Sequence, residues 1–125
     1  MELLIAVVDD DIAVRESLVS LIRSVGMDVK VFASAEEFLS SVNGSKLDCL
    51  ILDVRLPGMN GFELQRHLVA SRRKVPVIFM TAHGYDERAR SEAASPWTVA
   101  YLTKPFSEDE LLDAVHKASK WKPTD

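Results

Sequence analysis

Apolar residues in this chain fall into five short runs, and the stretches between the runs carry apolar positions at the 3.6-residue spacing of a helix. Unbroken apolar runs are typical of strands in a parallel sheet whose two faces are both covered. The pattern predicts an α/β fold in which five strands alternate with five helices. The five runs are Leu3–Val8, Val29–Phe32, Cys49–Leu52 and the segments that end at Thr81 and Lys104.

One run differs from the others. Residues 29 to 32 alternate polar and apolar positions more than the rest, so we expect this strand at an edge of the sheet. Local signals also mark the helix ends. Asp11 is a plausible N-cap, and Gly26 follows the same helix as a stop. Three capping boxes mark further helix starts, namely Ser34 with Glu37, Asn60 with Glu63 and Ser107 with Glu110.

Polar residues stand where four of the predicted strands end. Ligands of parallel sheets bind at the carboxyl ends of the strands, so these residues should converge on one rim. They are Asp9, Asp10, Asp11, Asp53, Thr81 and Lys104. Of these, Asp11 is better explained as a helix cap than as part of a site, because it directly precedes a periodic helix.

Carboxylates gathered on one rim repel each other. Two unit charges about 4 Å apart cost roughly 4 kcal/mol at an effective dielectric constant near 20. A cation is therefore required, and oxygen ligands without histidine or cysteine favour Mg²⁺. Such sites commonly pair one or two carboxylates with phosphate oxygens, so the expected substrate is a phosphoryl group.

These residues lie in motifs that resemble the receiver domain of two-component response regulators. The resemblance covers Leu3 to Ala118 and is carried by Val8–Asp11, Leu52–Gly61, Met80–Ala82 and Lys104–Phe106. The residues around Asp53 and Thr81 are similar to those of the FixJ-type branch of this family. The resemblance implies a flavodoxin-like, CheY-like doubly wound sheet of five parallel strands in the order 2-1-3-4-5. On this basis residues 1–121 form the receiver domain, and residues 122–125 are a tail or the start of a linker.

The resemblance also implies roles for the rim residues. Asp53 would be the phosphoacceptor. Mg²⁺ would be held by Asp10, Asp53 and the backbone carbonyl of Arg55, with Asp9 acting through a bound water. Lys104 would pair with Asp53 before the transfer and with a phosphoryl oxygen afterwards.

Two residues are implied as the switch. Thr81 would donate a hydrogen bond to the phosphoryl group, and Tyr101 would turn into the space that the Thr81 hydroxyl vacates. This movement would alter the surface of the fourth helix, fifth strand and fifth helix. Tyr101 can equally be read as a packed core residue. A cis peptide bond is expected between Lys104 and Pro105.

The implied function is a phosphorylation-activated signalling switch that accepts its phosphoryl group from a sensor histidine kinase. It would not be an enzyme in the usual sense, although it would catalyse its own phosphotransfer and dephosphorylation. FixJ-type members usually continue into a DNA-binding domain, so the expected output is transcription through a domain outside this chain. A homodimer through the altered surface is a further expectation.

Length and charge set bounds on the alternatives. The chain has 125 residues, 47% of them hydrophobic, which supports one domain with a proper core. Its net charge of −4 argues against direct binding of nucleic acid. The single cysteine, Cys49, excludes an internal disulfide and is expected to be buried, and a cytoplasmic setting fits. The first apolar run is too short to cross a membrane, and we read no targeting signal.

Two other function classes stay open. The unusual stretch from Tyr85 to Trp97 is compatible with an interaction module that works without phosphorylation. The Asp-x-Asp pattern beginning at Asp9 resembles the nucleophile loop of haloacid-dehalogenase-type phosphatases, although that reading leaves Asp53 unexplained. The stretch is unusual because it departs from the pattern of the receiver domains that the chain resembles. Trp97 stands where those domains have the glycine that ends the fourth helix, and we expect Pro96 to end the helix instead. Trp97 is either packed on the sheet or exposed as a partner anchor.

Overall fold

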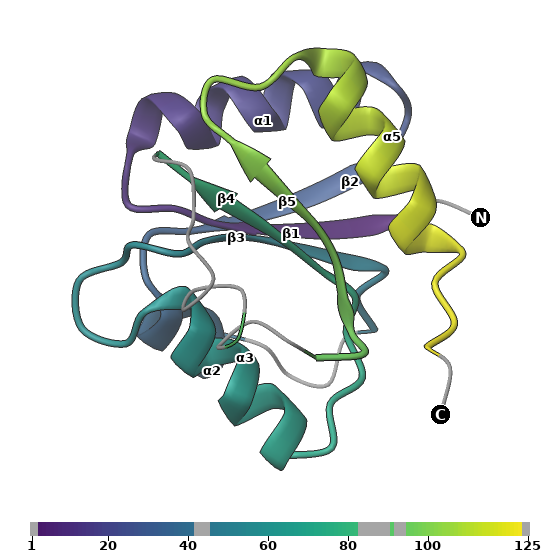
Figure 1. The fold of residues 1–125 in the computed structure, drawn as a ribbon. Helices are drawn as coiled ribbons and strands as arrows, with labels where there is room; N and C mark the ends of the chain where they lie inside the picture. The colour runs from purple at the N-terminus through teal and green to yellow at the C-terminus, as the bar shows by residue number, and fades with distance from the viewer. Residues whose placement is uncertain (1–2, 42–45, 83–90, 92–94, 124–125) are drawn as a thin grey trace.

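A computed structural model describes residues 3–41, 46–82, 91 and 95–123. Within them lies one five-stranded parallel sheet in the order β2-β1-β3-β4-β5 (Figure 1). The strands are β1 (Leu4–Val8), β2 (Asp28–Phe32), β3 (Cys49–Asp53), β4 (Val77–Thr81) and β5 (Thr98–Thr103). The predicted strands, their order and the edge position of β2 are all confirmed.

Helices cover both faces of this sheet. The described helices are α1 (Ile12–Ser24), α2 (Ala35–Ser41), α3 (Gly61–Ala70) and α5 (Glu108–Ser119). Figure 1 shows α1 and α5 on one face and α2 and α3 on the other. The predicted fourth helix falls almost wholly outside the described residues. None of the described helices is long and apolar enough to cross a membrane.

Two apolar cores result, one on each side of the sheet. The α1/α5 core contains Ile51 and Met80 from the central strands, and the α2/α3 core contains Leu52 and Phe79. Residues of β3 and β4 are buried throughout because successive side chains point to opposite faces and both faces are covered. Cys49 is fully buried in the α1/α5 core, as predicted. The central strands therefore hold their carboxyl ends in fixed positions.

Most of the predicted helix starts are confirmed. The side chain of Asp11 accepts a hydrogen bond from the backbone of Ala13, and complete capping boxes begin α3 at Asn60 and α5 at Ser107. The start of α2 corrects one detail. Ser34 accepts from the Glu37 amide as predicted, but the Glu37 carboxylate accepts from Ala33 instead of Ser34 (both 3.0 Å).

Two helices end in the same hydrogen-bonded motif with different residues at its critical position. After α1, Gly26 has φ +83° and donates to Arg23, while Met27 donates to Ile22. After α3, Arg72 has φ +59°, and the equivalent bonds run from Arg72 and from its neighbour back to the last turn. Glycine is favoured in this left-handed conformation because glycine has no Cβ atom. The predicted stop at Gly26 is confirmed, whereas Arg72 holds the same conformation with a full side chain.

Candidate functional site

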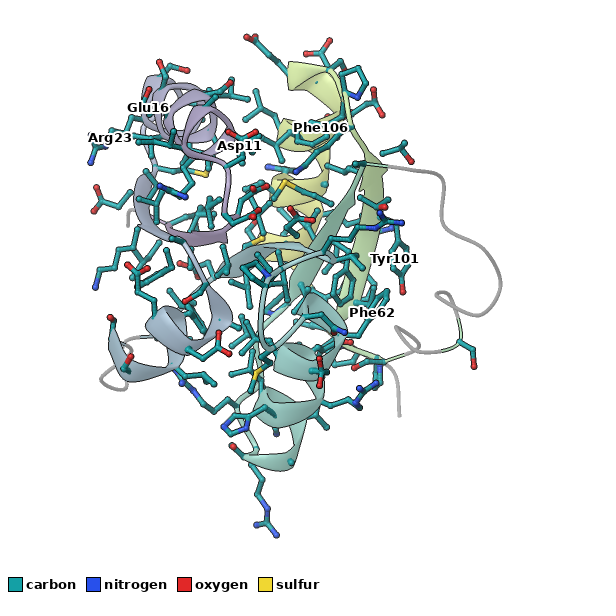
Figure 2. All side chains as sticks on the ribbon, turned by 90° about the vertical axis from the view of Figure 1, so that its left-hand side faces the viewer. Asp11, Glu16, Arg23, Phe62, Tyr101 and Phe106 are labelled. Atoms are coloured by element: carbon teal, nitrogen blue, oxygen red, sulfur yellow. The ribbon has the colours of Figure 1, made fainter. Side chains whose placement is uncertain are left out.

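The carboxyl ends of four strands meet at one rim of the sheet, as the sequence predicts. Asp9 directly follows β1, Asp53 ends β3, Thr81 ends β4, and Lys104 directly follows β5. Figure 2 views the molecule from the side on which this rim lies. Strand pairing sets this convergence, because Val8 lies opposite Leu52, and Thr81 lies opposite the last residue of β5.

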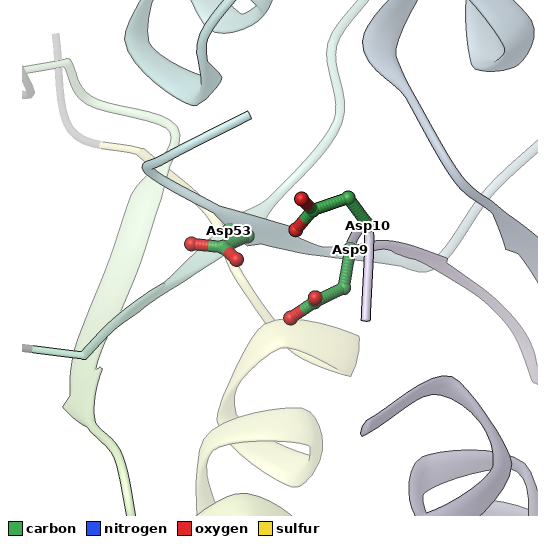
Figure 3. A group of neighbouring side chains, drawn as sticks. All are labelled: Asp9, Asp10 and Asp53. Carbon is green, nitrogen blue, oxygen red and sulfur yellow. The ribbon is translucent and has the colours of Figure 1, made fainter. Parts of the chain in front are cut away.

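Three carboxylates form a cluster on the rim, which we call the acid trio: Asp9, Asp10 and Asp53. One oxygen from each lies within 4.8 Å of the others. Figure 3 shows the three side chains close together, with those of Asp9 and Asp10 extending toward Asp53. Asp9 is fully buried and Asp53 is 6% exposed, whereas Asp10 is exposed. Two carboxylates shielded from water thus adjoin a third that solvent can reach.

The ammonium group of Lys104 contacts two carboxylates of the trio. Its Nζ lies 2.8 Å from Asp9 Oδ2 and 3.2 Å from Asp53 Oδ2. The predicted pairing of Lys104 with Asp53 is present, but the contact with Asp9 is shorter. One ammonium group therefore bridges the two buried carboxylates and partly offsets their repulsion.

Backbone amides bind the remaining oxygens of these two acids. The amide of Asp11 donates to Asp9 Oδ1 at 2.9 Å, and the amide of Arg55 donates to Asp53 Oδ1 at 3.0 Å. Asp9 thus accepts on both oxygens and has no exposed surface. These bonds fix the orientation of both carboxylates.

The electrostatics of the rim are unbalanced without a further cation. Burial raises the pKa of Asp53 above its usual range, the charge of Asp9 adds to the rise, and the Arg55 amide and Lys104 oppose it. Burial alone would lower the pKa of Lys104, but its hydrogen bond to Asp9 and the charges of both acids raise it overall. The lysine therefore stays charged while Asp53 is held in an environment that disfavours its ionised form.

The residues on the rim fit a hard divalent cation. The donors are carboxylate oxygens from three residues, which is the chemistry that Mg²⁺ prefers. One of them, Asp10, is exposed, so that an ion with its waters can reach the group. A cation there would also offset the repulsion that raises the pKa of Asp53.

The loop after β3 is built to pass close to Asp53. Gly58 has φ +74°, a left-handed conformation that glycine readily adopts in a turn. A Cβ atom on Gly61 would clash with the Asp53 carbonyl oxygen, so only glycine fits at this position. The Glu36 carboxylate accepts from the Met59 amide at 3.0 Å, which ties the loop to α2, and this bond lowers the pKa of Glu36.

The other rim residues belong to β4 and β5. Thr81 is buried, and its backbone oxygen accepts from the Lys104 amide at 2.7 Å. Tyr101 is half-buried and stacks on Phe79, with ring centroids 5.5 Å apart and an interplanar angle of 11°. The Lys104–Pro105 peptide bond is cis, as predicted.

Comparison with known proteins identifies this arrangement. The family model described as "Response regulator receiver domain" matches residues 5–116. The chain belongs to the response regulator receiver domain family. The receiver domain is 46% identical to the response regulator protein TodT of Pseudomonas putida over 119 residues, covering 95% of this chain and 52% of that protein. It is 39% identical to the transcriptional regulatory protein FixJ of Bradyrhizobium diazoefficiens, covering 91% of this chain and 55% of FixJ.

The fold comparison agrees. The crystal structure of FixJ-N superposes with a TM-score of 0.86 at 32% identity, covering all of this chain and 99% of that one. The predicted family and fold are confirmed, and closeness to the FixJ-type branch is supported. The receiver domain spans about half the length of the relatives it matches by sequence.

The receiver domain departs from the family pattern before β5, and the structure shows how that segment is rebuilt. Thr98 donates to the Ser95 carbonyl, and Trp97 donates to the Ser95 hydroxyl, which closes a turn with Pro96 inside it. Trp97 is half-buried and does not adopt the left-handed conformation of a glycine cap. Trp121, just after α5, donates from Nε1 to the Pro96 carbonyl at 2.7 Å.

Sequence reasoning missed several residues that shape the site of this receiver domain. Arg15 donates to the Asp9 carbonyl at 2.8 Å, and its position on the first turn after the acidic triplet was a usable signal. Glu36 carried no such signal, because its partner Met59 is 23 residues away. Tyr85, the first residue of the stretch that the sequence analysis singled out, lies outside the described residues.

Proposed function

We propose that this receiver domain is a phosphorylation-activated signalling switch of a two-component system and that Asp53 accepts the phosphoryl group. The observation that carries the proposal is the acid trio in contact with Lys104 at the carboxyl ends of β1 and β3. Membership of the receiver family supports it. Residues 1–121 would form the receiver domain, and residues 122–125 would be a tail or the start of a linker.

The proposed step is an attack by an Asp53 carboxylate oxygen on the phosphorus of a phosphohistidine. The new O–P bond forms as the P–N bond breaks, and the imidazole leaves with the electron pair and takes up a proton. A loose transition state of this kind depends on positioning and on positive charge near its outer oxygens. The Arg55 amide supports the positioning, because it holds one Asp53 oxygen in place.

The residues that would hold Mg²⁺ are Asp10, Asp53 and the carbonyl of Arg55, with Asp9 acting through a bound water. When bound, the ion would neutralise charge on the carboxylates and on the phosphoryl oxygens. Asp9 is fully buried, and each of its carboxylate oxygens already accepts a hydrogen bond. Both observations support an indirect role for Asp9 in holding the ion.

Lys104 would act on both sides of the transfer. Before it, the ammonium group holds the Asp53 carboxylate at 3.2 Å. After it, the same group would pair with a phosphoryl oxygen, a role that suits a point charge on a flexible stem. Thr81 would donate a hydrogen bond to the phosphoryl group. Thr81 and Tyr101 would then change the surface of the fourth helix, β5 and α5.

The phosphatase alternative requires Asp9 to be the nucleophile. Asp9 has no exposed surface, and its oxygens accept from Lys104 and from the Asp11 amide. A nucleophile needs an oxygen lone pair that can reach the substrate. Asp53 also accepts on both oxygens, but it retains 6% exposure where Asp9 has none, so the geometry favours Asp53.

The partners follow from the family and the relatives. A sensor histidine kinase would supply the phosphoryl group. Because TodT and FixJ are about twice as long as this chain and FixJ is named a "transcriptional regulatory protein", we propose a DNA-binding output domain outside this chain. A homodimer through the altered surface and a cytoplasmic location belong to the same proposal. The receiver domain would catalyse only its own phosphorylation and dephosphorylation.

Intact mass after treatment with acetyl phosphate and Mg²⁺ tests the proposal. The wild type should gain the mass of one phosphoryl group, and Asp53→Asn or EDTA should abolish the gain. Asp9→Asn is the matched control for the phosphatase reading. A gain that only Asp9→Asn removes would support that reading, and no gain in any sample would favour the interaction module.

A further inference from the structure

Strand β4 alternates regularly between the two cores. Val77 and Phe79 contribute to the α2/α3 core, while Ile78 and Met80 contribute to the α1/α5 core. This period of two is the ordinary behaviour of a strand. It provides a reference for the neighbouring strand β5, which is paired to β4 along its length.

Strand β5 breaks the alternation at one point. Val99 and Ala100 are adjacent, yet both pack in the α1/α5 core. The pairing explains this, because Thr98 lies opposite Val77, Ala100 lies opposite Ile78, and Val99 has no partner between them. The extra residue is a β-bulge, which shifts every later side chain of the strand by one position.

The bulge decides which face Tyr101 occupies. Thr98 and Tyr101 are three residues apart, so in a regular strand they would point to opposite faces. With the bulge, Tyr101 lies opposite Phe79 and joins the α2/α3 core, and Leu102 points to the α1/α5 core. The ring centroid of Phe79 in turn lies 5.1 Å from that of Phe62 in α3. Figure 2 shows Phe62 and Tyr101 on the same side of the molecule.

A buried glutamine holds the strand on the early side of this bulge. Gln65 of α3 is 3% exposed, and its Nε2 donates to the hydroxyl of Thr98 at 2.8 Å. A one-residue slip of β5 would turn Thr98 to the other face and leave the buried amide without this acceptor. An unsatisfied buried donor is costly, so the pair opposes the slip.

We propose that Gln65 is a positioning residue that fixes the register of β5 through Thr98. In this register Tyr101 stacks on Phe79, and Lys104, two residues after Leu102, reaches Asp9. The functional consequence rests on the proposed function, in which Tyr101 and Lys104 respond to phosphorylation. The register itself does not depend on it.

Hydrogen exchange of the unmodified protein tests the register directly. Gln65→Leu and Thr98→Val each remove the hydrogen bond with little change of shape, and the double variant completes a cycle. Leu68→Val is the matched control, because Leu68 is also buried on α3 and its truncation lowers stability without touching the bond.

Each single variant should speed amide exchange in residues 100–102 of β5 by roughly three- to tenfold relative to residues 6–8 of β1. The nuclear Overhauser contact between the rings of Tyr101 and Phe79 should weaken as well. The double variant should add little to either effect. In Leu68→Val both strands should change together, and the ring contact should persist.

Equal changes in β5 and β1 for Gln65→Leu, with the ring contact intact, would overturn the proposal and leave Gln65 as an ordinary buried residue. These readouts need no phosphoryl group. If Asp53 fails to become phosphorylated, the proposed function fails while the register result stands. If Asp53 is phosphorylated but the register is insensitive to Gln65, only this inference fails.

Discussion

The two ends of β5 are held in place by different kinds of interaction. At the carboxyl end, Lys104 bridges the buried carboxylates of Asp9 and Asp53. At the other end, hydrogen bonds between neutral groups tie the strand to α3 through Gln65 and tie Pro96, just before the strand, to Trp121. A charged group also lies near this end, since Lys117 Nζ is 5.5 Å from the centroid of the Trp121 ring. One end therefore responds to charge, and the other end is largely indifferent to it.

The charged end of β5 can therefore respond to a change of charge, whereas the neutral end stays fixed. A phosphoryl group adds about −1.5 to −2 charges at one point, and only the Lys104 end has the cation and the acids that would feel it directly. The Thr98 end stays in place, so a shift of Tyr101 would change the position of its ring relative to that end of the strand. Salt should distinguish the two ends, because it screens exposed and partly buried charges more than neutral bonds.

The largest expected effect comes from Lys104→Met, which removes the cation and leaves two buried carboxylates facing each other. The free energy of unfolding in EDTA and low salt should fall by about 2 to 4 kcal/mol. Mg²⁺ should restore part of the loss. Urea denaturation with and without Mg²⁺ measures both. A loss of the same size in 1 M salt would contradict the electrostatic account of this end.

Asp53→Asn should act in the opposite direction in EDTA. Burial and the charge of Asp9 raise the pKa of Asp53 in the folded protein above its ordinary value of 3.8. A raised carboxyl pKa adds stability that is fully present below the unfolded-state value and is lost as pH rises through the folded value. The variant should therefore match the wild type near pH 3 and become the more stable protein by pH 7.

Thermal unfolding of both proteins across this pH range checks the sign. The variant should also lose the stabilisation that Mg²⁺ gives the wild type, since one donor oxygen is gone. A variant that is less stable than the wild type at pH 7 in EDTA would contradict the proposed charge balance.

At the neutral end, Trp121→Phe keeps an aromatic ring but removes the donor to the Pro96 carbonyl. We expect a loss of about 1 kcal/mol that depends little on salt, because the phenyl ring keeps an aromatic face for Lys117, whose Nζ lies 5.5 Å from the Trp121 ring centroid. Trp97→Phe is the matched control, because it changes the other tryptophan and keeps this bond. Denaturation curves at two salt concentrations give the comparison, and a strong salt dependence would show that this end is not neutral.

An effect of similar size but opposite sign should come from Arg72→Gly, which lies outside both ends. Because a left-handed conformation costs an L-residue about 1 kcal/mol, the variant should be more stable by roughly that amount. Gly26→Ala, in the equivalent motif after α1, should lose a similar amount. Neither change should depend on Mg²⁺ or salt, so a Mg²⁺-dependent effect would reveal a link to the rim that the contacts do not show.

Much of this architecture was predictable because its signals are local. Unbroken apolar runs such as Cys49–Leu52 indicate buried strands. An aspartate at the end of such a run indicates a functional site, because burying a charge without a partner is costly. The capping boxes at Asn60 and Ser107 each lie within four residues. The positions of the acids at the strand ends then predicted that they meet on one rim, and the family resemblance implied the strand order.

The features that escaped prediction depend on contacts between distant segments. The bulge at Val99 lies in the pairing of β5 with β4, and Gln65, which we propose fixes this register, is 33 residues away from Thr98. Nothing near Arg72 indicates a left-handed residue, because the usual glycine is absent. Only the folded protein shows that Lys104 approaches Asp9 more closely than Asp53.

The central claim is that Asp53 carries the phosphoryl group, and identification of the modified aspartate tests it most directly. Borohydride reduces an acyl phosphate on aspartate to homoserine, which peptide mass mapping locates without any mutation. After treatment with acetyl phosphate and Mg²⁺, the account predicts homoserine at position 53 alone and none in EDTA. Homoserine at Asp9 or Asp10, or none at all in a sample whose intact mass shows the adduct, would contradict it.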